Sequence, residues 1–163
     1  MGLEDLNDLF LDELKDIFNA EKQLTKALPK MAKAAASKQL QTAFQAHLKE
    51  TQGQIERLEK VFQIIGKPAR GKTCKAMEGL VEEGSELMEE EAEPAVLDAG
   101  LICAAQKVEH YEIATYGTLS TWAGILGHDK AVKLLEANLA EEKATDEKLS
   151  KLARQINFEA DAA

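Results

Sequence analysis

Apolar residues recur every three or four positions along most of the chain, which is the pattern of amphipathic helices that face a common core. The repeat runs from Leu3 to about Ala36 and resumes after Ser37, a residue type that caps helix starts. Pro94 suits the first turn of a later helix, and Gly127 ends it. The pattern predicts helices over residues 3–36, 37–65, 74–90, 94–126 and 129–157.

The lengths of the links between these helices predict the topology. Very short links join the first helix to the second and the fourth to the fifth, so each pair is expected to form an antiparallel hairpin. Residues 66–93 are long enough to cross the bundle with a short helix inside. We therefore predict an all-α fold in a single domain, 1–163, with two hairpins joined by a long crossover in a four-helix bundle. A helical solenoid is disfavoured because such arrays need three or more repeats.

Polar residues interrupt the apolar stripe of every long helix. They lie near the helix midpoints, and midpoints meet whichever way the helices run. The cluster is expected to contain Glu21; His47, Glu50 and Gln54; Glu109, Glu112 and Tyr116; and Glu142 and Asp146.

This set of acids requires cations. An ionised carboxylate that is buried without a partner costs several kcal/mol, and neighbouring like charges add to that cost. The inward stripes contain no Lys or Arg. Raised pKa values can keep some carboxyls neutral, but six in one place are hard to sustain in that way. The pattern therefore predicts a dinuclear metal site.

Each residue taken alone also has a simpler interpretation. A single glutamate such as Glu21 can reach solvent at a bundle edge, and His47 can be a hydrogen-bonded core histidine. Gln54 is expected beside the ligands or as a packing amide, and His110 beside the ligands or on the surface. Tyr116 is expected to donate its hydroxyl to a carboxylate of the cluster.

The composition of the chain argues against some classes of binding partner. The 163-residue chain carries a formal net charge of −9 and has no basic cluster with interleaved aromatics, which argues against nucleic acid. No apolar run approaches the roughly 18 residues of a membrane span. Cys74 and Cys103 lie far apart and no secretion signal precedes the helices, so we expect free thiols in a reducing cytoplasm.

Five segments carry a family resemblance: "LNDLFLDELKDIFNAEKQLTKALPKMAKAA", "AHLKETQGQIERLEKVF", "KTCKAMEGLVEEG", "AAQKVEHYEIATYGTL" and "LAEEKATDEKLSKLA". In order and spacing they resemble the bacterial YciF/YciE stress-response family of ferritin-like proteins. The resemblance implies a ferritin-like bundle related to rubrerythrin, and a bacterial, cytoplasmic homodimer.

The resemblance also implies ligand roles. Glu21 and Glu109 match the single glutamates of the ferritin-like pattern, and Glu112 matches an additional carboxylate of rubrerythrin-type sites. Glu50 and Glu142 match the bridging glutamates.

The two histidines of that pattern are replaced by Gly53 and Thr145. His47 and Asp146 are the substitutes one turn away, and Gln54 is a weaker one.

A site rich in carboxylates with at most one histidine suits two iron or manganese ions. It favours ferrous oxidation or reduction of peroxide, with peroxide or dioxygen as co-substrate, and a manganese catalase is the neighbouring enzyme class. The alternative is a non-enzymatic helical stress protein with a structural or vestigial metal site that acts through oligomerisation. A third possibility is an adaptor whose acidic short helix docks a basic partner, although a solvated crossover is the commoner use of such a segment.

Overall fold

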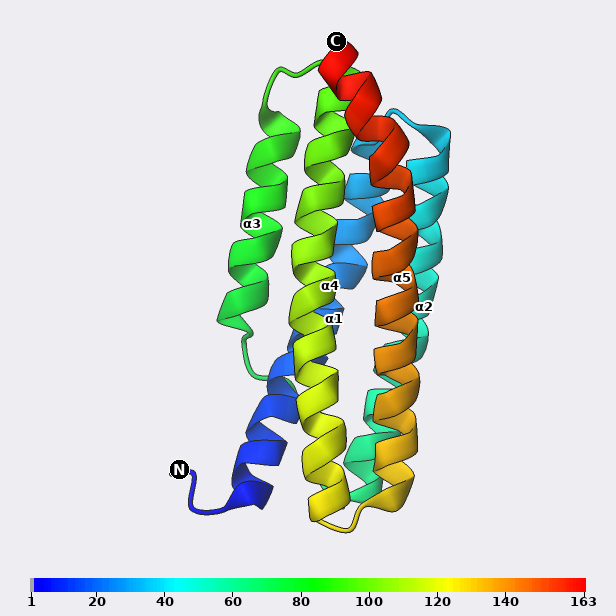
Figure 1. Ribbon diagram of the computed structural model, residues 1–163. Coiled ribbons are helices and arrows are strands. Elements are labelled where there is room, and N and C mark those ends of the chain that lie inside the picture. Colours follow the sequence, from blue (N-terminus) through cyan, green and yellow to red (C-terminus); the bar gives the residue numbers. More distant parts are fainter. Residues whose placement is uncertain (1) are drawn as a thin grey trace.

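The computed structural model describes residues 2–163, which form five α-helices and no strand (Figure 1). The helices are α1 (Leu6–Ala34), α2 (Lys38–Ile64), α3 (Lys75–Glu89), α4 (Pro94–Ile125) and α5 (Asp129–Ala162). The prediction of an all-helical chain is confirmed. α1 begins at Leu6 because the Asp5 carboxylate accepts the Asp8 N–H at 2.9 Å and caps the helix, and α5 continues past residue 157 to Ala162.

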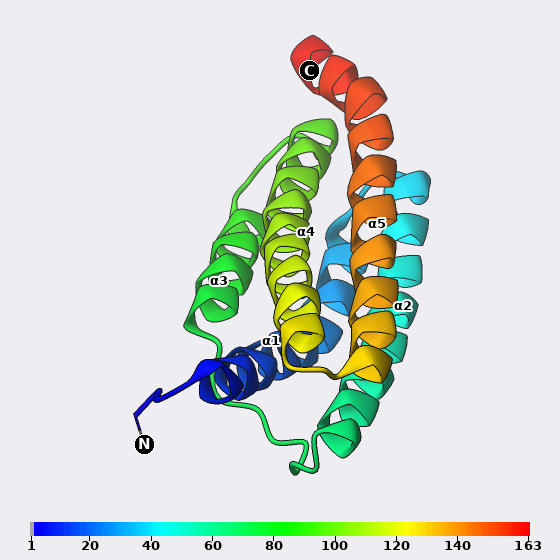
Figure 2. The same ribbon diagram turned by 60° about the horizontal axis from the view of Figure 1, so that its bottom comes forward.

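Four long helices lie side by side, and the short α3 lies outside them (Figure 1; Figure 2). α1 packs against α2, and α4 packs against α5, each pair running in opposite directions around a short turn. Contacts between α2 and α5 and between α1 and α4 join the two pairs, while α3 covers α1 and α4. This arrangement brings the middles of the four long helices together.

Glycine shapes two of the helix ends. Gly66 follows α2 with φ 67°, and Gly127 follows α4 with φ 78°, a backbone region that favours glycine. The next residue in each case donates its N–H back into the last turn, Lys67 to the Phe62 carbonyl at 3.0 Å and His128 to the Ala123 carbonyl at 2.8 Å. The turn at Gly127 is what folds α5 back along α4.

A single buried carboxylate ties the first turn to α4. Asp98 is 2% exposed and accepts the N–H groups of Ala36 at 2.8 Å and Ser37 at 2.7 Å. Ser37 in turn caps α2 by accepting the Leu40 N–H. This contact links the two hairpins at one end of the molecule.

The interior combines a continuous apolar core with the polar cluster at mid-length. Large side chains such as Leu14, Phe44 and Leu119 are at most 1% exposed, and burial of each contributes about 1.5 to 3 kcal/mol. Phe18 and Phe62 meet edge to face, with ring centroids 5.3 Å apart. Within residues 2–163, none of the helices combines the length and the apolar character needed to span a bilayer.

Candidate metal centre

Four side chains from three helices converge in the middle of the bundle. One ligand atom from each of His47, Glu109, Glu112 and Glu142 lies within 4.8 Å of the others. α4 supplies two of them because residues three apart share a helix face. His47 is 2% exposed and the three glutamates are fully buried, so water reaches none of them freely.

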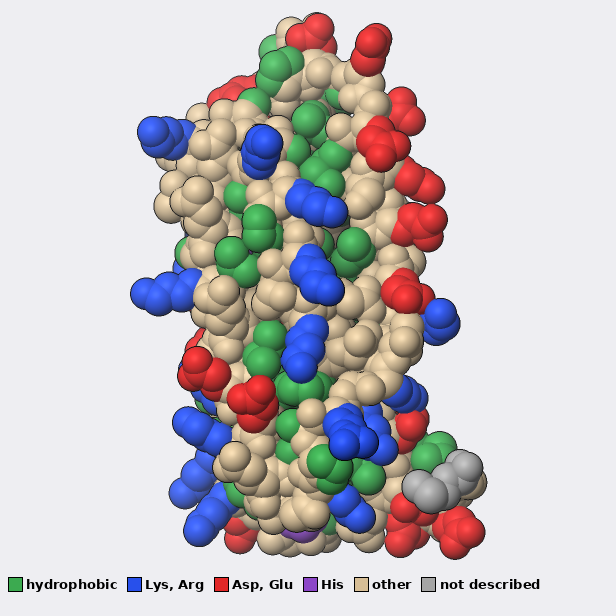
Figure 3. All heavy atoms as spheres, turned by 180° about the vertical axis from the view of Figure 1, so that it is seen from behind, with side chains coloured by type: hydrophobic (Ala, Val, Ile, Leu, Met, Phe, Trp, Pro, Cys, Tyr) green, Lys and Arg blue, Asp and Glu red, His purple; other side chains and the backbone are tan. Residues whose placement is uncertain are grey.

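The cluster has ligand atoms but no internal cation. Among the described residues, neither nitrogen of His47 and neither oxygen of Glu109, Glu112 or Glu142 has a hydrogen-bond partner. The buried polar side chains of residues 2–163 include no Lys or Arg, and Figure 3 shows basic side chains on the outer surface. Such a set of unpaired buried acceptors is costly as it stands.

The closest approach within the cluster is that of His47 to Glu109. Nε2 and Oε1 are 2.8 Å apart, yet neither atom has a partner in hydrogen-bonding geometry among residues 2–163. Both side chains supply candidate ligand atoms to the cluster.

Burial raises the pKa values of all three clustered glutamates. The pKa of Glu109 rises to about 8, chiefly through burial, and repulsion from Glu21, Asp146 and Glu50 adds to it. The pKa values of Glu112 and Glu142 lie well above the usual range for the same primary reason. Without a cation the cluster therefore retains protons, and a bound cation would displace them.

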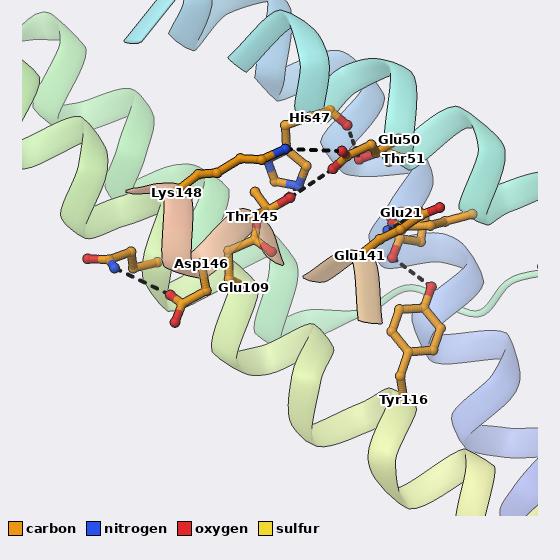
Figure 4. Close-up of polar contacts among 12 residues, drawn as sticks. Glu21, His47, Glu50, Thr51, Glu109, Tyr116, Glu141, Thr145, Asp146 and Lys148 are labelled. Atoms are coloured by element: carbon orange, nitrogen blue, oxygen red, sulfur yellow. Dashed lines mark hydrogen bonds and ion pairs between the residues drawn. The ribbon is translucent and has the colours of Figure 1, made fainter. Parts of the chain in front are cut away.

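Glu21 of α1 borders this cluster. It is fully buried, and the Tyr116 hydroxyl donates to its Oε1 at 2.7 Å (Figure 4). Its Oε2 has no partner among the described residues. Burial and then repulsion from Glu142 raise the pKa of Glu21 well above its usual range.

Glu50 lies at the rim rather than inside the cluster. Its side chain is 30% exposed, accepts the Thr145 hydroxyl at 2.8 Å and faces Lys148 Nζ at 3.9 Å (Figure 4). The structure therefore does not place Glu50 among the buried ligand atoms.

Asp146 also lies at the rim. Its side chain is 22% exposed, accepts an N–H of Gln106 at 3.3 Å and faces His110 at 3.4 Å. His110 itself is 69% exposed and lies on the surface. Asp146 was predicted in the inward stripe of α5, but that stripe instead passes through Asn138, Glu142 and Thr145. Asp146 therefore lies at the partly exposed edge of the contact between α4 and α5.

Sequence reasoning missed a polar network beside Glu21. Glu141 accepts an N–H of Gln54 at 3.1 Å and pairs with Arg57 at 2.7 Å. Arg57 also donates to the buried Asn138 at 3.0 Å. The side-chain oxygen of Gln54 has no partner among the described residues. Asn138, a buried amide one turn before Glu142, was the signal in the sequence.

The chain is similar to characterised relatives over nearly its whole length. The family described as "Domain of unknown function (DUF892)" matches residues 5–161. Protein YciF of Escherichia coli (strain K12) is 52% identical over 154 residues, which cover 94% of this chain and 93% of that protein.

Solved structures agree with the sequence comparison. The crystal structure of the E. coli stress protein YciF matches with a TM-score of 0.93 at 50% identity, over 96% of this chain and 99% of that one. YcfI from Rhodopseudomonas palustris, which has been proposed to be a structural protein, matches with a TM-score of 0.88 at 50% identity, over 90% and 94%. A protein of Xanthomonas campestris pv. campestris, at 19% identity and a TM-score of 0.73 over 94% of each chain, shares the fold.

Proposed function

This chain belongs to the DUF892 family and is a homologue of E. coli YciF, and we propose that it is a ferritin-like protein that binds two iron or manganese ions. The observation that carries the proposal is the convergence of His47, Glu109, Glu112 and Glu142 without a protein partner among the described residues. The packing of two antiparallel hairpins with α3 in the crossover supports a ferritin-like four-helix bundle.

The charge of the buried acids supports two ions. Glu21, Glu109, Glu112 and Glu142 are buried carboxyls that together carry four negative charges when ionised. Two divalent cations would neutralise that charge, and an imidazole ligand adds none. Glu50 and Asp146 have partners at the rim and are not needed for this balance.

The unpartnered atoms divide between two positions. The first ion would be held by His47, Glu109, Glu112 and Glu142, whose ligand atoms lie together. The second would be held by Glu21, whose Oε2 has no partner among the described residues, and Gln54 Oε1 is the further unpartnered oxygen available to it.

Tyr116 and Glu141 act on this second position. Tyr116 donates a hydrogen bond to Glu21, and Glu141 accepts one from the Gln54 amide. Both residues therefore hold a ligand atom in place without contacting an ion themselves.

The donor set favours iron or manganese. Carboxylate and carbonyl oxygens with a single imidazole are hard ligands, and such sites suit these metals better than zinc or copper. A bound pair of such ions supplies electrons for reduction of peroxide or dioxygen, or accepts them from ferrous iron. The chain's own contribution is to exclude water and to keep four carboxyls and one imidazole directed at one place.

Metal stoichiometry tests the proposal. Metal-free protein is reloaded anaerobically with ferrous iron or manganese, desalted and analysed for bound metal. We expect about two ions per chain in the wild type and fewer than about one in Glu142→Gln. Glu136→Gln, which changes an exposed glutamate of the same helix, is the matched control and should retain both ions. Less than about half an ion in the wild type would overturn the proposal.

A structural role is the second candidate, and the role proposed for YcfI favours it. In that case metal would raise the melting temperature, while ferrous iron and peroxide would disappear only at the rates seen in buffer. Oxygen evolution from peroxide would instead indicate a manganese catalase.

A further inference from the structure

A small pocket on the surface between α2 and α5 leads to the cluster. Its volume is about 30 Å³, and its lining includes Glu50, Thr145 and Lys148 at the rim and His47 below them. It has room for about two water molecules. His47 belongs both to the lining of this pocket and to the group of converging ligands, so the pocket adjoins the cluster at a side chain that is 2% exposed.

We propose that this pocket is the route by which divalent cations reach the cluster, with Glu50 as the first ligand that they meet. The proposal rests on the two-ion function above and assigns Glu50 and Lys148 a role in uptake rather than in holding the bound ions.

The polar groups along the pocket form a series from the outside inwards. The Glu50 carboxylate is 30% exposed, and the Thr145 hydroxyl orients it through a 2.8 Å hydrogen bond. Below it His47 is 2% exposed, and neither of its nitrogens has a partner within residues 2–163. A cation can therefore pass from a carboxylate in contact with water to an imidazole that is not.

The next ligand lies directly behind His47. Glu109 Oε1 is 2.8 Å from His47 Nε2 and is fully buried, so a cation that reaches His47 is already beside the other ligands of the first position.

The ammonium group of Lys148 lies beside the Glu50 carboxylate, where an incoming cation would bind. Its Nζ lies 3.9 Å from Glu50 Oε1, and its side chain is 62% exposed. Exposed ion pairs of this kind contribute little to stability, so a divalent cation can displace the ammonium group. The same positive charge slows the approach of cations while it remains in place.

Uptake kinetics test the route independently of catalysis. Cobalt(II) is mixed with metal-free protein in a stopped-flow spectrophotometer, and its visible absorption bands follow the formation of protein-bound cobalt. We expect Glu50→Gln to slow uptake about tenfold and Lys148→Ala to accelerate it several-fold, because both changes act on the charge at the mouth. Ala43→Leu, which fills the pocket from α2, should also slow uptake.

Control variants distinguish the effect of charge at the opening of the pocket from the effect of charge elsewhere on α5. Glu147→Gln and Lys151→Ala alter an exposed ion pair on the same helix, with atoms 3.0 Å apart, and should leave the rate unchanged. All variants should still bind the wild-type amount of cobalt, and circular dichroism checks that each is folded.

Two results would overturn the route while leaving the proposed function intact. Unchanged uptake rates in both Glu50→Gln and Lys148→Ala would show that cations enter elsewhere. A Glu50→Gln protein that binds one cobalt fewer would show that Glu50 is a ligand of a bound ion. A wild type that binds no cobalt, iron or manganese would instead remove the proposed function itself.

Discussion

Raising the pH should destabilise the metal-free protein, because its buried glutamates keep protons that the unfolded chain releases. The pKa of Glu109 rises from the usual 4.5 to about 8 on folding, so the folded state binds more protons between these values. Stability falls with pH wherever the folded state holds the extra proton. The contribution of protonated Glu109 is thus complete below about pH 4.5 and is lost as the pH rises through about 8.

The magnitude follows from that interval. The difference between 4.5 and about 8 corresponds to about 5 kcal/mol at about 1.36 kcal/mol per pH unit. A loss of this size is a large part of the roughly 5 to 15 kcal/mol by which domains are stable.

Urea unfolding followed by far-ultraviolet circular dichroism measures the effect. The free energy of unfolding of chelator-treated protein is determined at several values between about pH 5 and pH 8 and should decrease throughout. Glu109→Gln cannot lose a proton at this position, so its free energy of unfolding should fall less steeply than that of the exposed control Glu136→Gln.

Metal should reverse the trend. Ligand carboxyls must lose their protons to bind an ion, so the stability of the loaded protein should increase with pH over the same range. A free energy of unfolding of the metal-free protein that is constant or increases with pH would refute the reasoning about the cluster.

Three substitutions extend these tests. Tyr116→Phe removes the 2.7 Å hydrogen bond to Glu21 and should lower the free energy of unfolding of the metal-free protein by about 1 to 3 kcal/mol and weaken retention of the second ion on dialysis. Gln54→Leu removes the unpartnered Oε1 and should reduce the bound metal from about two ions to about one by elemental analysis. Asp98→Ala leaves the N–H groups of Ala36 and Ser37 without their acceptor and should lower the free energy of unfolding in urea by about 2 to 3 kcal/mol, with or without metal. A change in metal content would contradict the conclusion that Asp98 holds the α1–α2 turn and takes no part in the metal site.

The helices and the buried acids were accessible from sequence because helical periodicity reports which side chains face inwards. Glu109 and Glu112 interrupt an otherwise apolar stripe. In the structure both are buried, and no Lys or Arg is among the buried side chains of the described residues. The family prediction is confirmed by a 52% identical relative that covers nearly the whole chain.

The sequence did not determine in the same way which face of α5 points into the bundle. Steps of three and four both fit a helix, so the sequence allowed a stripe through Asp146 as well as one through Thr145. The partner helix decides between them: Thr145 donates to Glu50 of α2, and Asn138 accepts from Arg57 of the same helix. Such choices depend on contacts between residues more than eighty positions apart.

The hydrogen bonds of Asp98 to the α1–α2 turn could not be predicted from the sequence either. Asp98 reads in sequence as an ordinary polar residue in the first turns of a helix, yet it holds the backbone of residues 36 and 37. No periodicity marks an acid whose partners are backbone groups in another hairpin.

The two halves of the cluster come from different halves of the chain. His47 belongs to the α1–α2 hairpin, whereas Glu109, Glu112 and Glu142 belong to the α4–α5 hairpin. An ion bound by these ligands would join two hairpins that are otherwise held together by packing and by the hydrogen bonds of Asp98. A newly made chain without that ion should open more often and be degraded sooner, so the cellular amount of the protein would follow metal supply.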